Sequence, residues 1–143
     1  MSDDEFGIRN VFIDNCKTWG YLKRGIYFKT NADRGGFIKN IYVRNLQLDE
    51  VEDCIYITAN YMGEGKDFPS DVSDVFFSTI NCRKARETAI VIQGYAQKKV
   101  RNVFLDKIEV QSAKNGMTII NTENVTINEV VIGEKAKIPT AVK

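Results

Sequence analysis

The chain contains 143 residues, of which 43% are hydrophobic and 27% are charged, as is typical of one folded globular domain and not of a disordered segment. Its 20 Lys and Arg residues and 19 Asp and Glu residues leave a net charge of +1, which argues against nucleic acid or an anionic membrane as a partner. No apolar stretch approaches the roughly 20 residues that cross a bilayer. The acidic residues 1–5 do not resemble a signal peptide, so we expect a soluble chain without an export signal.

The sequence contains no histidine and three cysteines, and both counts exclude kinds of site. Without histidine there is no Ser-His-Asp or Cys-His nucleophile and no His-containing metal site. Cys16, Cys54 and Cys82 lie too far apart for a C-x-x-C metal site, and their odd number does not suit a disulfide framework. We therefore expect three buried thiols that act as small core residues, and neither a metal nor a cofactor.

A short pattern recurs along the chain, in which an Asn or Asp is followed by apolar residues at the first, third and sixth positions after it. The anchor residues of these units are Asn10, Asn40, Asp74, Asn102 and Asn124. The alternation within each unit and its many Val, Ile, Phe and Tyr residues favour β-strands over helices. A second apolar strand follows in residues 25–29, 54–58, 89–93 and 116–120.

The anchors lie 30, 34, 28 and 22 residues apart, so each repeat has room for two or three short strands. The same offsets recur in every unit, as they must when equivalent strands of successive coils stack on one another. A β-sandwich also contains many short strands, but it does not require recurring offsets. The sequence therefore predicts an all-β fold, a right-handed parallel β-helix of about four to five coils.

The anchor residues have a structural explanation that needs no ligand. Asn and Asp tolerate the left-handed backbone conformation, and stacked Asn amides can hydrogen-bond from one coil to the next. The gaps between strands fall in residues 31–36 and in the longer, glycine-containing loop 62–71. We expect residues 1–143 to form a single domain, with an irregular tail or cap over 133–143.

Strand alternation also predicts which side chains face the core. It places Ile26 and Phe28 on one face of their strand and Tyr27 and Lys29 on the other. The predicted core residues of the second strands are Ile26, Phe28, Ile55, Ile57, Ile90, Ile92 and Ile119.

Residues 25–42 contain three motifs in a row, namely Gly25-Ile26-Tyr27-Phe28-Lys29, Arg34-Gly35-Gly36 and Asn40-Ile41-Tyr42. This segment resembles glycoside hydrolase family 28, the polygalacturonase and related pectinase group, and particularly its bacterial members. They carry Gly-apolar-Arg-Ile-Lys, an Arg-Gly-Gly turn and an Asn-Ile-aromatic strand. The resemblance is specific over residues 6–61 and continues to residue 132 as generic coils, and it implies a pectin-lyase-like β-helix.

The resemblance implies little catalytic chemistry. Family members use an inverting mechanism with aspartates as general acid and general base beside a histidine, carried by Asn-x-Asp, Asp-Asp and Gly-His-Gly motifs. These motifs precede the strand that residues 8–16 resemble. The present chain has no histidine, hence no Gly-His-Gly, and no Asn-x-Asp that precedes an Asp-Asp pair. The only Asp-Asp pair, Asp3-Asp4, lies too close to that strand, and we interpret it as a solvated charge cluster. The expectation is the C-terminal part of such a protein, without its N-terminal catalytic coils, with no catalytic residue and inactive alone.

Two substrate-binding residues carry over individually. Lys29 matches the lysine of the Arg-Ile-Lys motif, which meets the uronate carboxylate, and Tyr61 matches a tyrosine that stacks on a sugar in the cleft. Tyr27 stands where the family has arginine, so a second cation would have to come from Arg24 or Arg34. The alternative interpretation is structural, with Lys29 as an exposed strand lysine and Tyr61 as a turn aromatic packed on the solenoid.

Two functional hypotheses remain. The first is a fragment of a polygalacturonase-like glycoside hydrolase whose partner is a pectic or related uronate-containing cell-wall polysaccharide. The second is a non-catalytic β-helix module that binds carbohydrate or assembles. Neither involves a cofactor, nucleic acid or a membrane. The family is typically secreted or periplasmic, although nothing in this sequence directs export, and an exposed N-terminal coil would favour a homo-oligomer, most simply a two-fold dimer.

Overall fold

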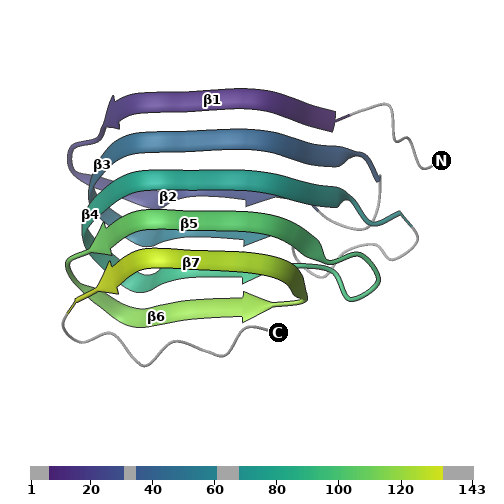
Figure 1. Ribbon diagram of the computed structural model, residues 1–143. Helices are drawn as coiled ribbons and strands as arrows, with labels where there is room; N and C mark the ends of the chain where they lie inside the picture. Colours follow the sequence, from purple (N-terminus) through teal and green to yellow (C-terminus); the bar gives the residue numbers. More distant parts are fainter. Residues whose placement is uncertain (1–6, 31–34, 61–67, 134–143) are drawn as a thin grey trace.

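The computed structural model describes residues 7–30, 35–60 and 68–133, which wind into a right-handed parallel β-helix (Figure 1). Every pairing between its strands is parallel. No helix in these ranges is long and apolar enough to cross a membrane. The strands are β1 Gly7–Lys17, β2 Tyr21–Lys29, β3 Phe37–Thr58, β4 Asp71–Gln93, β5 Val100–Val110, β6 Ala113–Ile120 and β7 Thr122–Ile132.

The strands form two walls of the solenoid. The first wall stacks β1, the first halves of β3 and β4, β5 and β7, in that order. The second wall stacks β2, the second halves of β3 and β4, and β6. Strands β3 and β4 are 22 and 23 residues long because each bends from the first wall into the second without interruption. Figure 1 shows the first wall in front, with β2 behind it.

The strand register confirms the repeat that the sequence predicts. In the first wall Ile41 of β3 pairs with Val11 of β1 and Val75 of β4. In the second wall Ile55 of β3 pairs with Ile26 of β2. Residues at equal offsets from the anchors therefore occupy equivalent places in successive coils.

The anchor residues adopt the left-handed backbone, as predicted. Their φ angles lie between 54° and 58° at Asn10, Asn40, Asp74, Asn102 and Asn124. Side chains of neighbouring coils bond to one another: Asn40 Nδ2 donates to Asn10 Oδ1 at 3.3 Å, and Asn124 Nδ2 donates to Asn102 Oδ1 at 2.7 Å. The anchors therefore bend the chain at the same place in every coil and bond along the solenoid.

A second set of left-handed residues lies five positions after the anchors, where the apolar positions are three residues apart instead of two. The set is Asn15, Asn45, Thr79, Lys107 and Glu129, with φ between 53° and 57°. Each left-handed residue reverses the alternation of the strand, so inward positions lie three residues apart across it and two apart elsewhere. This explains why the apolar offsets from each anchor are one, three and six.

The core lies between the two walls. Ile26, Ile55, Ile57, Ile90, Ile92 and Ile119 are buried, and Phe28 is half-buried against the core, so the predicted core face is confirmed. Cys54 and Cys82 are buried thiols, as predicted. For Cys16 the prediction is wrong: this thiol is exposed, because β1 has a neighbour on one edge only among the described strands.

Candidate functional site

An open groove lies on the outer face of the second wall, opposite the core. Its volume is about 540 Å³. Its lining residues are Lys23, Arg24, Tyr27, Lys29, Tyr56, Thr58, Asn60 and Gln93, and we call them the second-wall groove. Alternation places Tyr27, Tyr56 and Gln93 outward, because each is next to a buried core isoleucine in its strand. The parallel register then stacks Tyr27 on Tyr56, and Lys29 on Thr58 and Gln93.

Aromatic rings and a cation lie next to each other in the groove. The Tyr27 and Tyr56 rings meet edge to face, with centroids 5.4 Å apart. Lys29 Nζ lies 5.6 Å from the Tyr27 ring centroid, and the Lys29 side chain is exposed. An exposed ammonium beside aromatic rings suits a ligand that carries both negative charge and apolar C–H surface.

Arg24 contacts both tyrosine rings and two carboxylates. Its guanidinium carbon lies 4.8 Å from the Tyr56 ring centroid and 5.4 Å from that of Tyr27. Arg24 Nη1 donates to Glu52 at 2.6 Å, and Arg24 Nε lies 3.2 Å from an Asp53 oxygen without a hydrogen bond. Because two carboxylates balance its charge, Arg24 holds the tyrosine rings in place more than it adds positive charge to the groove.

Both carboxylate oxygens of Asp53 have partners within the protein. It is buried, and its Oδ1 accepts a hydrogen bond from the Thr88 N–H at 3.1 Å. Burial raises the pKa of Asp53 above its ordinary value, although the Thr88 hydrogen bond and the Arg24 charge act in the opposite direction. A buried carboxyl that is held in this way cannot reach a ligand in the groove.

Neutral polar groups follow Lys29 along the groove. Thr58 Oγ1 donates to Gln93 Oε1 at 3.3 Å, and the Asn60 N–H donates to Thr58 Oγ1 at 3.1 Å. The amide groups of Asn60 and Gln93 offer donors and acceptors that match the hydroxyl groups of a sugar. The described lining contains no Asp or Glu, so this part of the groove supplies binding groups and no acid–base pair.

Three of the five residues that the sequence singled out meet in this groove: Arg24, Tyr27 and Lys29. The other two, Arg34 and Tyr61, lie outside the described residues. Sequence reasoning missed Tyr56 and Gln93. The repeat could have found both, because they occupy in β3 and β4 the positions that Tyr27 and Lys29 occupy in β2.

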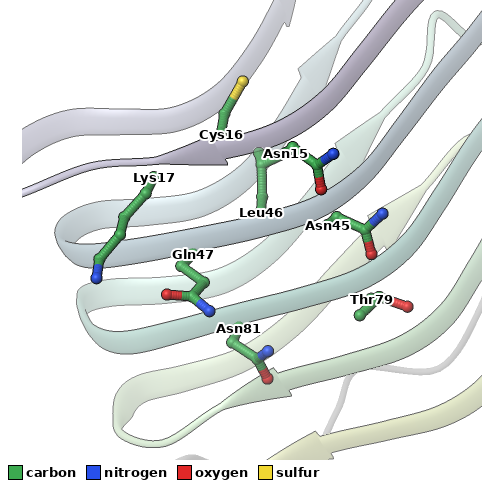
Figure 2. Close-up of a pocket in the computed structure, with 8 residues that line it drawn as sticks. All are labelled: Asn15, Cys16, Lys17, Asn45, Leu46, Gln47, Thr79 and Asn81. Atoms are coloured by element: carbon green, nitrogen blue, oxygen red, sulfur yellow. The ribbon is translucent and has the colours of Figure 1, made fainter.

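A second, smaller depression lies on the first wall near the bend (Figure 2). Its volume is about 350 Å³. Figure 2 shows two columns that run from strand to strand, one of Asn15, Asn45 and Thr79 and the other of Lys17, Gln47 and Asn81. The first column belongs to the second set of left-handed residues, so its position follows from the backbone bend. With one cation and no aromatic ring, this depression suits an acidic sugar less well than the second-wall groove does.

The sequence was also compared with models of known protein families. It matches the model described as glycosyl hydrolases family 28 over residues 2–135. The match includes both walls and every residue of the second-wall groove. Such a match, over nearly the whole of a chain that folds as a parallel β-helix, decides the assignment: the chain belongs to glycosyl hydrolases family 28.

Proposed function

We propose that the second-wall groove binds a uronate-containing polysaccharide or oligosaccharide of the pectic type, and that this chain alone does not hydrolyse it. The observation that carries the proposal is the placement of Lys29 beside Tyr27 and Tyr56 on one open face. Membership of a family that hydrolyses glycosidic bonds supports a sugar polymer as the ligand.

The groove chemistry suits an acidic sugar in three respects. The exposed ammonium of Lys29 can bond a uronate carboxylate, and charge-assisted hydrogen bonds contribute about 1.5–3 kcal/mol each. The tyrosine rings offer apolar surface to the C–H face of a sugar ring. Gln93 and Asn60 offer partners to its hydroxyl groups. A neutral sugar would use the last two features but not the first.

We expect no hydrolysis because the groove lacks a pair of free carboxyl groups. Inverting hydrolysis needs two carboxyl groups about 6.5–9.5 Å apart, on either side of the scissile bond. No Asp or Glu lines the described groove, and the nearby Glu52 and Asp53 are bound to Arg24. A polymer held here by Lys29 would meet no general acid in the described part of the chain.

Binding of a galacturonic acid oligomer, compared with a neutral galactose oligomer of equal length, tests the proposal by calorimetry. We expect K29A to weaken binding of the acidic oligomer roughly 10- to 100-fold, as the loss of one charge-assisted hydrogen bond implies. The matched control is K84A, because Lys84 is also an exposed strand lysine but lies outside the groove.

Equal affinities of K29A and K84A for the acidic oligomer would refute this binding mode.

A reducing-sugar assay with polygalacturonate tests whether this chain alone hydrolyses the polymer. Sugar release by the purified chain that is lost in D3N/D4N would show that it is an active hydrolase.

A further inference from the structure

A third hollow lies on the outer face of the first wall, over β4, β5 and β7, which stand next to one another in Figure 1. Its volume is about 360 Å³, within the range of about 300–1,000 Å³ that is typical of ligand sites. It shares no residue with the second-wall groove. Its outward-facing lining residues, which we call the first-wall pocket, are Phe76, Ser78, Phe104, Asp106, Thr126 and Asn128.

One face of the Phe104 ring forms the apolar part of the pocket. Successive rings of Phe12, Tyr42, Phe76 and Phe104 stack nearly parallel as an aromatic ladder, at centroid distances of 5.0, 4.7 and 4.8 Å. The next residue in the register is Thr126. Phe76 covers one face of the Phe104 ring, but Thr126 has no ring to cover the other. This face is therefore open to the apolar C–H face of a ligand.

A carboxylate and an amide stand beside this ring face. Asp106 lies two residues after Phe104 in β5, with the buried Leu105 between them, so both side chains point outward. Asn128 pairs with Asp106, and its Nδ2 donates to Asp106 Oδ1 at 2.7 Å. Asp106 Oδ2 and Asn128 Oδ1 can still accept hydrogen bonds, and the second N–H of Asn128 Nδ2 can donate one. Such a set matches neighbouring sugar hydroxyl groups, which both donate and accept.

The charge of Asp106 distinguishes this pocket from the second-wall groove. In the same column of the first coil, Asp14 forms an ion pair with Arg44 at 3.1 Å. The neighbours of Asp106 in the column are Ser78 and Asn128, which carry no charge. No Lys or Arg of the described ranges forms an ion pair with Asp106. An uncompensated carboxylate repels a uronate and suits the hydroxyl groups of a neutral sugar.

We propose that the first-wall pocket binds a neutral sugar unit, with its apolar face on the Phe104 ring and its hydroxyl groups bonded to Asp106 and Asn128. The two outer faces of the solenoid then select different sugars, because Lys29 in the second-wall groove attracts a carboxylate and Asp106 repels one. Neither site needs the other. A quaternary ammonium could also use a ring and a carboxylate, but one open ring face provides no cage around it.

NMR titration of the full chain with a neutral galactose oligomer tests the apolar half of the site. T126F places a ring on the open face of Phe104 and fills the pocket. We expect it to abolish binding, while urea denaturation shows unchanged or higher stability because the aromatic ladder gains a ring. The matched control is V131F, since Val131 lies on the same strand, is 59% exposed and is outside the pocket.

The polar half of the site is tested by D106A with E109A as its control, because Glu109 is exposed on the same strand and lies outside the pocket. We expect D106A to weaken binding of the neutral oligomer roughly 10- to 100-fold, as the loss of one hydrogen bond to a charged group implies. K29A should bind this oligomer as the unmodified chain does, which separates the site from the second-wall groove.

Loss of neutral-oligomer binding in T126F and D106A, with V131F, E109A and K29A unaffected, supports the site. Undiminished binding by T126F would overturn it, as would an unmodified chain that does not bind the oligomer. Weakening by K29A equal to that by D106A would assign the neutral sugar to the second-wall groove and overturn the proposal. Binding of tetramethylammonium without binding of the neutral oligomer would make the pocket a cation site and would also overturn it.

Discussion

The two walls share one core and one repeat, but their outer faces are built in different ways. The first wall carries two columns of like side chains, the aromatic ladder of Phe12, Tyr42, Phe76 and Phe104 and the Asn and Asp anchors. On the second wall one outward column changes from coil to coil, because Lys29 is followed by Thr58 and Gln93, beside the like pair Tyr27 and Tyr56. The unlike column places polar groups of different kinds beside the Tyr27 and Tyr56 rings, on a face that is open to a ligand.

The largest expected effect is on the core that both walls share. Phe77 is buried on the first wall and packs 6.4 Å from the Phe28 ring of the second. We expect F77A to lower the free energy of unfolding by about 3–5 kcal/mol, because it leaves a large cavity. Urea denaturation measures this, with I127A as the control because Ile127 is 38% exposed. Equal losses in the two variants would contradict a shared core.

Replacing one aromatic residue on each wall should separate the loss of stability from the loss of sugar binding. Phe76 lies between two stacked rings on the first wall, so F76A should cost about 1–3 kcal/mol of stability and leave binding of an acidic oligomer unchanged. Tyr56 lies in the groove, so Y56A should weaken binding of an acidic oligomer with a smaller loss of stability. Urea denaturation measures the stability of both variants, and calorimetry measures their binding of the acidic oligomer. A binding defect in F76A that Y56A lacks would reverse the assignment of the faces.

Two buried or half-buried aspartates should respond to pH in opposite directions. Burial opposes ionisation of Asp71, but Lys39 at 3.0 Å and Arg101 at 3.1 Å lower its pKa below the ordinary 3.8. Its stabilisation is therefore present above pH 3.8 and is lost as pH falls through the folded-state pKa. We expect D71N to lose about 1 kcal/mol at neutral pH and to match the unmodified chain in strong acid.

Asp53 has a raised pKa, so the folded chain holds this proton more tightly than the unfolded chain does. Its contribution to stability therefore falls as pH rises from 3.8 through the folded-state pKa. We expect D53N to remove this fall. Urea denaturation at a series of pH values measures both aspartates. A D53N curve parallel to that of the unmodified chain would show that Arg24 and Thr88 outweigh burial.

The smallest expected effect concerns the second set of left-handed residues. Thr79 is β-branched and has φ of 57°, whereas Asn15 and Asn45 at the equivalent positions suit that conformation. We expect T79N to stabilise the chain by about 0.5–1 kcal/mol. The control is T126N, because Thr126 is also exposed but is not among the left-handed residues. An equal gain from both variants would mean that backbone strain at Thr79 is not the cause.

The sequence alone was sufficient for the repeat, the parallel register, the inward face of each strand and the outward position of Lys29. These features depend on local chemistry that recurs: Asn and Asp tolerate a left-handed backbone, and alternation divides apolar from polar side chains. The second left-handed set was not predictable, because Thr79, Lys107 and Glu129 show no preference for that conformation and are held there by coil stacking.

The ion pairs of Arg24 and the exposure of Cys16 were decided only by the tertiary structure. Arg24 was expected as a possible uronate-binding cation, but stacking of β2 on β3 brings Glu52 and Asp53, which lie 28 and 29 residues further along the chain, against its guanidinium. Cys16 has the sequence pattern of a core residue and is nevertheless exposed. In a solenoid each coil is buried by its neighbours, so the same residue pattern is covered in the middle of the stack and open at its end.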